Sequence, residues 1–142
     1  YLVHKMQLAL GNLRGKRVAL WGLAFKAGTD DMREAPSLTI IADLLAAGAT
    51  VVAYDPVAQE TALHAFALEG IPASSVEMVN SKEAALVGAD ILAVVTEWPE
   101  FRAPDYAAVA AALHDKMVFD GRNLYEATHW ARVGVAMVGI GR

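Results

Sequence analysis

The chain of 142 residues contains no cysteine. This absence excludes disulfides, cysteine-bound metal ions and a cysteine nucleophile within the chain. It is compatible with a reducing, cytoplasmic location, which we expect for the protein. No apolar run reaches the roughly 18 residues that suggest a membrane span, and the start YLVHKMQLAL lacks the layout of a signal peptide. We therefore expect neither a disulfide framework nor a membrane partner.

The chain also lacks an excess of positive charge. Its 12 Lys and Arg residues face 16 Asp and Glu residues, so its net charge at pH 7 is -4. A general nucleic-acid binder is usually basic, and we therefore expect no nucleic-acid partner. Apolar residues, in contrast, are abundant at 56%. That fraction exceeds the average for soluble domains, and at this length it can form the core of one ordinary domain.

Two kinds of apolar pattern alternate along the sequence. Short, continuous runs predict buried strands, and longer runs with helical spacing predict helices. This alternation predicts an α/β, three-layer, Rossmann-like domain with a mostly parallel sheet and helices on both faces. The predicted strands lie within residues 18–21, 49–54, 76–80, 90–98, 117–121 and 135–141, and the predicted helices within residues 1–10, 36–47, 57–70, 81–90, 104–115 and 123–134.

Basic residues occur in the loops that follow the predicted strands. In such a fold, ligands bind beyond the carboxyl ends of the strands. Lys26, Arg33, Arg102 and Arg122 all lie in those loops. Each of them alone is typical of a surface charge or salt-bridge partner. Their common placement on one edge of an acidic domain indicates an anionic ligand.

The loop after the first strand, FKAGTDDMREAPS at residues 25–37, is unusually charged for a strand-to-helix connection. It contains neither of the common phosphate-binding patterns, G-x-G-x-x-G or G-K-[ST]. Its acids can satisfy the start of the following helix themselves. A phosphate would then be held mainly by Lys26 and by Arg122, which follows the flexible Gly121. Asp55 stands where Rossmann domains bind a ribose, but without the glycines we predict that it forms a turn before Pro56.

The remaining polar residues show no catalytic pattern. The four histidines have neither metal-ligand spacing nor paired carboxylates, and three or four converging metal ligands cannot be assembled. No serine stands in a G-x-S-x-G context. We therefore predict no metal and no self-contained catalytic site. A freestanding α/β interaction or regulatory domain without a nucleotide site remains an alternative. The four histidines are His4, His64, His114 and His129.

Five motifs occur in a fixed order along nearly the whole chain. Together they resemble the C-terminal, UDP-binding domain of the UDP-glucose/GDP-mannose dehydrogenase family, most closely that of the bacterial UDP-glucose 6-dehydrogenases. The resemblance implies that residues 1–10 are the end of an interdomain linker helix and that residues 11–142 form the UDP-sugar-binding domain. The motifs are GKRVALWGLAFKAGTDDMREAPS, VVAYDPVA, VVTEWPEFRAPD, VFDGRNLYE and GIGR.

The resemblance also implies a division of labour in a longer parent protein. In the family, the full enzyme oxidises UDP-glucose to UDP-glucuronate and reduces two NAD. An N-terminal dehydrogenase domain of the same chain would bind most of the NAD and carry the catalytic cysteine, so this chain alone should be inactive. We also expect a homo-oligomeric parent. GDP-mannose or a UDP-N-acetylhexosamine is an alternative substrate.

The resemblance assigns roles to four residues of this chain. Phe25, Lys26 and Arg122 match family residues that contact the UDP-sugar. Arg33 matches an arginine that reaches across the interdomain cleft toward the NAD. The loop at residues 25–37 would then be charged because it faces two anionic ligands, with its acids aligning its basic side chains.

Overall fold

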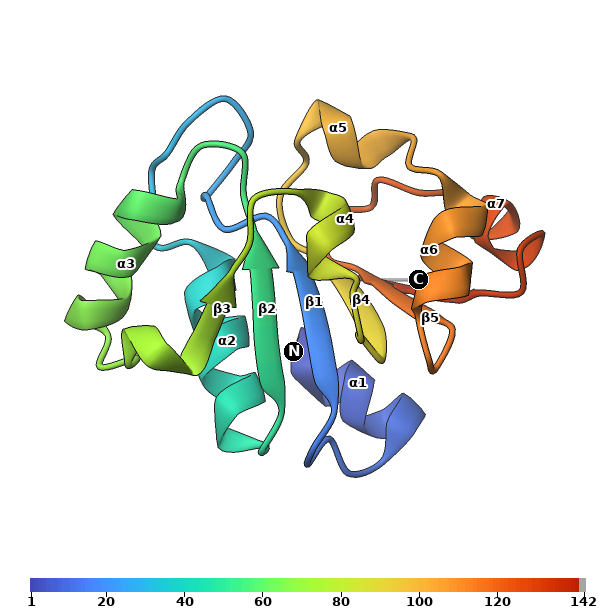
Figure 1. Ribbon diagram of the computed structural model, residues 1–142, viewed down its shortest axis with the longest axis horizontal. Coiled ribbons are helices and arrows are strands. Elements are labelled where there is room, and N and C mark those ends of the chain that lie inside the picture. The colour runs from blue at the N-terminus through green and yellow to red at the C-terminus, as the bar shows by residue number, and fades with distance from the viewer. Residues whose placement is uncertain (141–142) are drawn as a thin grey trace.

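The strands form one parallel sheet in a computed structural model, which describes residues 1–140 (Figure 1). The strand order is β3-β2-β1-β4-β5-β6, and every neighbouring pair is parallel. This order is that of a doubly wound fold, in which the chain reverses direction across the sheet between β1 and β4. The strands are β1 (Arg17–Trp21), β2 (Thr50–Tyr54), β3 (Val76–Met78), β4 (Ile91–Val94), β5 (Met117–Asp120) and β6 (Ala136–Gly139).

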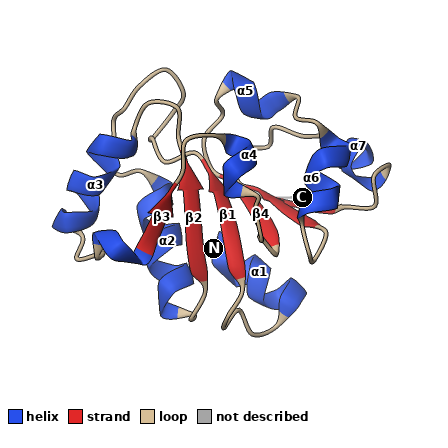
Figure 2. Cartoon of the chain, in the orientation of Figure 1, coloured by secondary structure: helices blue, strands red, loops and turns tan. Residues whose placement is uncertain are grey.

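Helices cover both faces of this sheet, as the sequence predicted. In Figures 1 and 2, α2 lies behind the sheet, and α4 and α6 lie in front of it. None of the helices in residues 1–140 is both long and apolar enough to cross a membrane. The helices are α1 (Leu2–Leu10), α2 (Pro36–Ala46), α3 (Gln59–Leu68), α4 (Lys82–Ala85), α5 (Pro99–Arg102), α6 (Tyr106–Ala112) and α7 (Ala127–Ala131), with a 3-10 turn at Ala73–Ser75.

The central strands are buried on both faces, which explains their continuous apolar runs. All four residues of β4 are buried, and so are four of the five residues of β1. Because helices cover both sides, no alternation of polar residues is needed. Trp21 of β1 stacks on Phe101 with 5.2 Å between the ring centroids. Its indole Nε1–H donates to the carbonyl of Lys82 at 3.0 Å, which ties α4 to the sheet.

Three segments differ from the sequence-based expectation. The strand predicted within residues 90–98 ends at Val94. The helix predicted within residues 123–134 is reduced to α7. The backbone N–H of Tyr125 instead donates to Asp120 at 2.9 Å, and Asn123 adopts a left-handed φ of 56°. These features make the start of the segment a turn. The short helix α5 occupies part of the segment that was expected to be a loop. The part of the last strand predicted at Gly141 lies outside the described residues.

Helix α1 packs into the same core as the sheet. Leu2, Val3 and Met6 are buried, and the Lys5 ammonium donates to the carbonyl of Gly139 in β6 at 2.6 Å. Gly11 ends the helix with a φ of 77°, a conformation that glycine adopts without strain. That this helix is the end of an interdomain linker stays a prediction.

A buried carboxylate, that of Asp55, connects the loops at the carboxyl edge of the sheet. Asp55 directly follows β2 and is only 2% exposed. Both of its oxygens accept hydrogen bonds, which confirms the predicted turn and leaves no oxygen directed to a ribose. Its five donors are the backbone N–H groups of Leu23, Ala24, Val57 and Ala58 and the indole Nε1–H of Trp98, at 2.8 to 3.1 Å.

Replacement of this carboxylate should destabilise the whole edge. We expect Asp55→Ala to lower the free energy of unfolding by about 3 kcal/mol or more, because it leaves buried N–H groups without acceptors. Urea denaturation followed by circular dichroism measures this change. The control is Asp30→Ala, which removes an exposed side chain that makes no hydrogen bond within residues 1–140, and it should shift the energy by less than about 0.5 kcal/mol. Equal midpoints for the two variants would contradict the role of Asp55.

Candidate functional site

The candidate site lies between the loops that follow β1 and β4. These loops leave the sheet toward opposite faces, and such a switch point creates a crevice for ligands. The Thr96 hydroxyl donates to the carbonyl of Ala24 at 2.8 Å, which joins the two loops. At Gly22, with a φ of +101°, an added Cβ would lie 2.5 Å from the Cβ of Thr96. Only glycine therefore permits this close approach.

Arg122 is held at this edge by two acids. It lies in the turn after β5, where the fully buried Asp120 accepts its backbone N–H at 3.0 Å. Its guanidinium Nη2 lies 2.6 Å from Oε2 of Glu97, which follows β4. The other carboxylate oxygen of Glu97 lies 3.4 Å from the backbone nitrogen of Ala27. Glu97 thus connects Arg122 with the loop that carries Lys26, and the structure brings together two loops that the sequence assigned to one ligand.

The glycine before Arg122 has a different role from the one predicted. The expectation was that Gly121, through its backbone freedom, lets the chain turn beside Arg122. The left-handed conformation in this turn belongs instead to Asn123, with a φ of 56°. At Gly121, an added Cβ would lie 3.0 Å from the carbonyl oxygen of Val94. This glycine therefore allows the turn after β5 to pass close to the end of β4.

Phe25 and Lys26 lie exposed on the loop after β1. The backbone N–H of Phe25 donates to the carbonyl of Asp31 at 2.8 Å, which closes the loop on itself. The ring of Phe25 remains 41% exposed. Lys26 is exposed and forms no ion pair with any residue in the range 1–140. An exposed aromatic ring and a lysine without an ion pair in residues 1–140 are therefore neighbours in the loop after β1.

Arg33 is aligned by Asp31 on the outside of the same loop. Its Nε lies 3.0 Å from Oδ1 and its Nη2 lies 2.9 Å from Oδ2 of Asp31, a two-point contact. The Arg33 side chain is nevertheless 89% exposed. This contact, together with the backbone N–H of Arg33, lowers the pKa of Asp31 to about 2. Phe25 and Glu34 join this pair around a cavity of about 480 Å³.

The acids of this loop do not satisfy the start of α2, in contrast to the expectation. No side chain caps this helix, which begins after Ala35 with Pro36 in its first turn. The Asp31 carboxylate instead accepts hydrogen bonds from the backbone N–H and from the side-chain Nε–H of Arg33. The prediction that acids align the basic side chains is therefore confirmed for Arg33. For Lys26, the described residues show no such partner.

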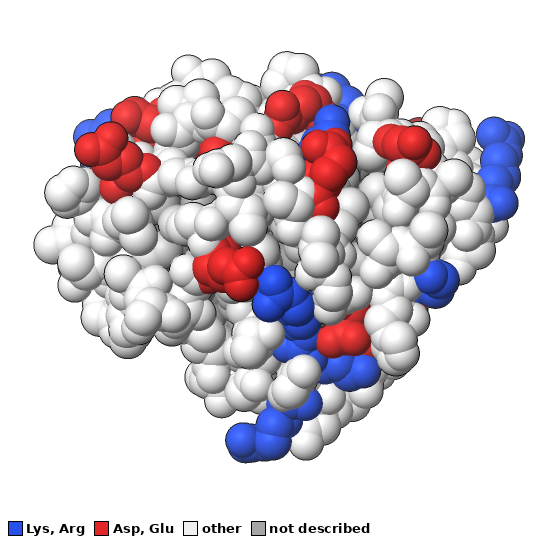
Figure 3. All heavy atoms as spheres, viewed as in Figure 1, with Lys and Arg blue, Asp and Glu red and all other residues white. Residues whose placement is uncertain are grey.

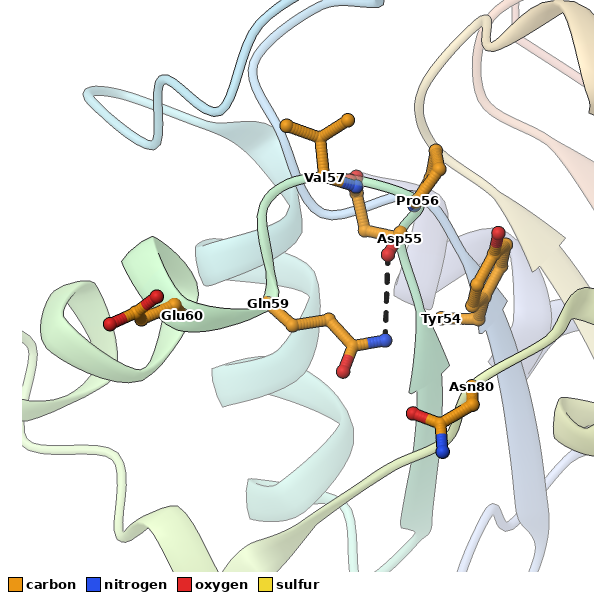
Figure 4. A pocket seen from close by; sticks show the side chains of 7 residues that line it. All are labelled: Tyr54, Asp55, Pro56, Val57, Gln59, Glu60 and Asn80. Carbon is orange, nitrogen blue, oxygen red and sulfur yellow. Dashed lines mark hydrogen bonds between the residues drawn. The ribbon is translucent and has the colours of Figure 1, made fainter.

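A second cavity, of about 370 Å³, lies after β2 (Figure 4). Its wall includes Tyr54, Gln59 and Asn80 but none of the four predicted site residues. The Gln59 side-chain amide donates to the carbonyls of Val79 and Asp55 at 2.6 and 3.4 Å. Burial and a hydrogen bond with Glu100 raise the pKa of Tyr54 above its ordinary value. With no Lys or Arg among its lining residues, this cavity is not suited to a phosphate.

The amino ends of the strands carry a separate group of charged residues. There the structure places Nδ1 of His114 at 3.0 Å from Asp115 and 3.4 Å from Asp90, although the sequence showed no metal-ligand spacing for this histidine. These three side chains could hold a metal ion, but the Lys16 ammonium already lies 2.8 Å from Asp115. Figure 3, viewed as Figure 1, shows basic and acidic side chains interspersed on the lower part of the molecule. We interpret the group as an ion-pair network.

Two residues of the site region were missed in the sequence. Glu97 and Trp98 stand in the motif VVTEWPEFRAPD, of which only Arg102 was considered for a ligand, yet Glu97 contacts Arg122 and Trp98 donates to Asp55. A usable signal was the position of Glu97: an acid directly after a buried strand, on the edge where basic loops meet. Arg102 itself is exposed and forms no ion pair within residues 1–140.

The pairing of Asp31 with Arg33 can be measured by its titration. Since the pKa of Asp31 is depressed, the pair is fully present above the ordinary value of 3.8 and is lost as the pH falls through about 2. We expect carboxyl-carbon NMR to give a midpoint of about 2. In Arg33→Ala the midpoint should return toward 3.8. Arg102→Ala is the matched control and should leave it unchanged. A midpoint that is the same in all three proteins would exclude the pair.

Comparison with known proteins shows the family to which this chain is similar. Residues 19–127 match the model of the UDP-glucose/GDP-mannose dehydrogenase family, UDP binding domain. The chain is 43% identical over 136 residues to the UDP-glucose 6-dehydrogenase of Pseudomonas aeruginosa, covering 96% of this chain and 30% of that protein. It is 38% identical to the UDP-glucose 6-dehydrogenase YwqF of Bacillus subtilis over 141 residues, which are 99% of this chain and 31% of that protein.

A solved structure has the same architecture. A UDP-glucose dehydrogenase from Pyrobaculum islandicum aligns with a TM-score of 0.78 and 33% identity, over 98% of this chain and 28% of its own. This match confirms the predicted Rossmann-like fold. The chain spans about 30% of the length of the relatives that it matches. It belongs to the UDP-glucose/GDP-mannose dehydrogenase family, in which it corresponds to the UDP binding domain.

Proposed function

We propose that this chain binds the UDP part of a nucleotide sugar within a longer, NAD-dependent UDP-glucose 6-dehydrogenase. One observation carries the proposal: the loops with Lys26 and Arg122 meet at the switch point of the sheet, joined through Glu97. A diphosphate is an anion with several acceptor oxygens. A compact ammonium and a planar guanidinium from two different loops suit such a group.

The three residues assigned to the UDP-sugar would have different roles. Lys26, without an ion pair within residues 1–140, would supply an uncompensated positive charge. Arg122 would supply the N–H groups that Glu97 leaves unused, since a guanidinium has five donors. Phe25, with its exposed ring, would pack against an apolar or aromatic face of the ligand.

The proposal assigns NAD mainly to another part of the parent protein. The loop from Gly22 to Ala35 lacks the dinucleotide-binding glycines, so this chain does not supply that cradle. NAD would act as the hydride acceptor. Arg33 would reach toward it, because Asp31 aligns a side chain that is 89% exposed. The catalytic cysteine also belongs to the other part, because this chain has none.

UDP-glucose is the preferred substrate within this proposal. The relatives with 43% and 38% identity are both UDP-glucose 6-dehydrogenases. The alternative has support from an NDP-N-acetyl-D-galactosaminuronic acid dehydrogenase of Methanosarcina mazei, whose structure aligns with a TM-score of 0.79 and 26% identity, over 99% of this chain and 28% of its own. A homo-oligomeric, cytoplasmic parent that forms UDP-glucuronate remains part of the proposal.

Removal of either basic residue should weaken UDP binding. In the full-length parent, we expect Lys26→Ala or Arg122→Ala to lower UDP affinity roughly 10- to 100-fold, since each contact with a charged oxygen contributes about 1.5–3 kcal/mol. Arg122→Lys should recover only part of the loss, because a point charge cannot make a two-point contact. Calorimetric titration with UDP gives the affinities.

The matched control for these variants is Arg102→Ala. It removes the same charge from the same edge of the sheet, at an exposed residue outside the proposed site, and should change UDP affinity less than about twofold. If all three alanine variants bind UDP like the wild type and have unchanged melting temperatures, the site is misplaced. Equal weakening by all three would show a general charge effect instead of specific contacts.

Arg33 should affect NAD more than UDP-glucose. In the parent, we expect Arg33→Ala to raise the KM for NAD, because its proposed contact is with that ligand, while the KM for UDP-glucose stays near the wild-type value. Steady-state kinetics with each substrate varied in turn provides the comparison. A raised KM for UDP-glucose with an unchanged KM for NAD would reverse the assignment.

A further inference from the structure

We infer that Glu97 is a positioning residue that sets Arg122 and the loop of Lys26 in place for a diphosphate. This inference rests on the proposed function of the same site. Glu97 would not contact the ligand. It would act through Arg122, whose guanidinium it holds, and through the backbone of Ala27 beside Lys26.

The backbone around Glu97 is fixed on both sides. The preceding residue, Thr96, is fully buried, and its hydroxyl donates to the carbonyl of Ala24 at 2.8 Å. The following residue, Trp98, donates its indole N–H to Asp55 at 3.1 Å. The side chains of Thr96 and Trp98 thus attach the segment that carries Glu97 to the neighbouring loops. This attachment limits where the Glu97 carboxylate can lie.

The carboxylate of Glu97 bridges two loops from that place. One oxygen lies 2.6 Å from Nη2 of Arg122, and the other lies 3.4 Å from the nitrogen of Ala27. The Arg122 and Glu97 side chains are only 30% and 24% exposed, so water screens this pair less than an open surface pair. Asp120 binds the backbone N–H of Arg122 at 3.0 Å. Arg122 is thus hydrogen-bonded at its backbone, and its guanidinium lies at ion-pair distance from Glu97 before any ligand arrives, although Oε2 of Glu97 accepts no hydrogen bond within residues 1–140.

Glu97 has two opposite effects on an anionic ligand. Its negative charge repels a phosphate, so removal of that charge would by itself strengthen binding. Its contact with Arg122, however, already restricts the long Arg122 side chain in the free protein. The ligand therefore loses less binding free energy to the ordering of that side chain. Because Arg122 neutralises the carboxylate at 2.6 Å, we expect the repulsion to be small and the positioning effect to be larger.

The test is Glu97→Gln in the full-length parent, with UDP as the titrated ligand. The substitution keeps the size of the side chain and removes its charge. We expect UDP affinity to fall roughly three- to tenfold, within the range measured for coupled neighbouring residues. Glu126→Gln is the matched control: the same charge is removed from an exposed residue that follows Arg122 closely in the sequence and makes no side-chain cap. It should leave the affinity unchanged. An unchanged or increased affinity in Glu97→Gln would overturn the inference.

A second measurement separates positioning from a structural role. In the Arg122→Ala background, Glu97→Gln should no longer lower UDP affinity three- to tenfold, because the main residue through which Glu97 acts is gone and the carboxylate that remains mainly repels the ligand. An equal loss in both backgrounds would show that Glu97 does not act through Arg122. If Glu97→Gln fails to fold, Glu97→Asp keeps the charge but shortens the side chain. That variant should also weaken UDP binding; wild-type affinity would overturn the inference.

The same titrations distinguish this inference from the proposed function. If Arg122→Ala binds UDP weakly while Glu97→Gln binds like the wild type, only the positioning role is wrong. If the wild-type parent does not bind UDP, or if Arg122→Ala binds it normally, the proposed site itself is wrong.

Discussion

The candidate site depends on the buried carboxylate of Asp55. A parallel sheet fixes where its strands end, but it does not fix the loops beyond them. Asp55 accepts hydrogen bonds from the loops after β1, β2 and β4. Through the backbone of Ala24 it orders the start of the segment that carries Lys26, and through Trp98 it orders the neighbouring Glu97. The residue that would hold a ribose in a dinucleotide-binding domain is therefore used here to assemble the edge on which an anion would bind.

Acidic residues make a basic site possible in a chain with a net charge of -4. Asp31 aligns Arg33, and Glu97 holds the guanidinium of Arg122. Each acid binds its basic partner from one side and leaves part of that partner exposed. Lys26 forms no ion pair within residues 1–140, although its charge contributes to the lowered pKa of Asp31. The proposed site thus combines two arginines beside acids with one lysine that forms no ion pair within residues 1–140.

The fold was predictable because buried parallel strands are continuous apolar runs, as β4 shows. The loops that could bind a ligand were predictable because ligands lie beyond the carboxyl ends of such strands. That rule selected the loops of Lys26 and Arg122, while the family resemblance supplied the roles that we propose for them. Long-range contacts carry no sequence pattern of their own. The pair of Glu97 with Arg122 joins loops after different strands, and the shortened α7 results from a hydrogen bond between Tyr125 and Asp120.

We propose that UDP binds where the loops after β1, β4 and β5 meet. Titration of UDP into the ¹⁵N-labelled 142-residue chain, with the amide shifts mapped on the structure, measures this placement. The account predicts shifts concentrated at Phe25, Lys26, Glu97 and Arg122. Shifts confined to the cavity beside Tyr54, or to the ion-pair network around His114, would contradict it.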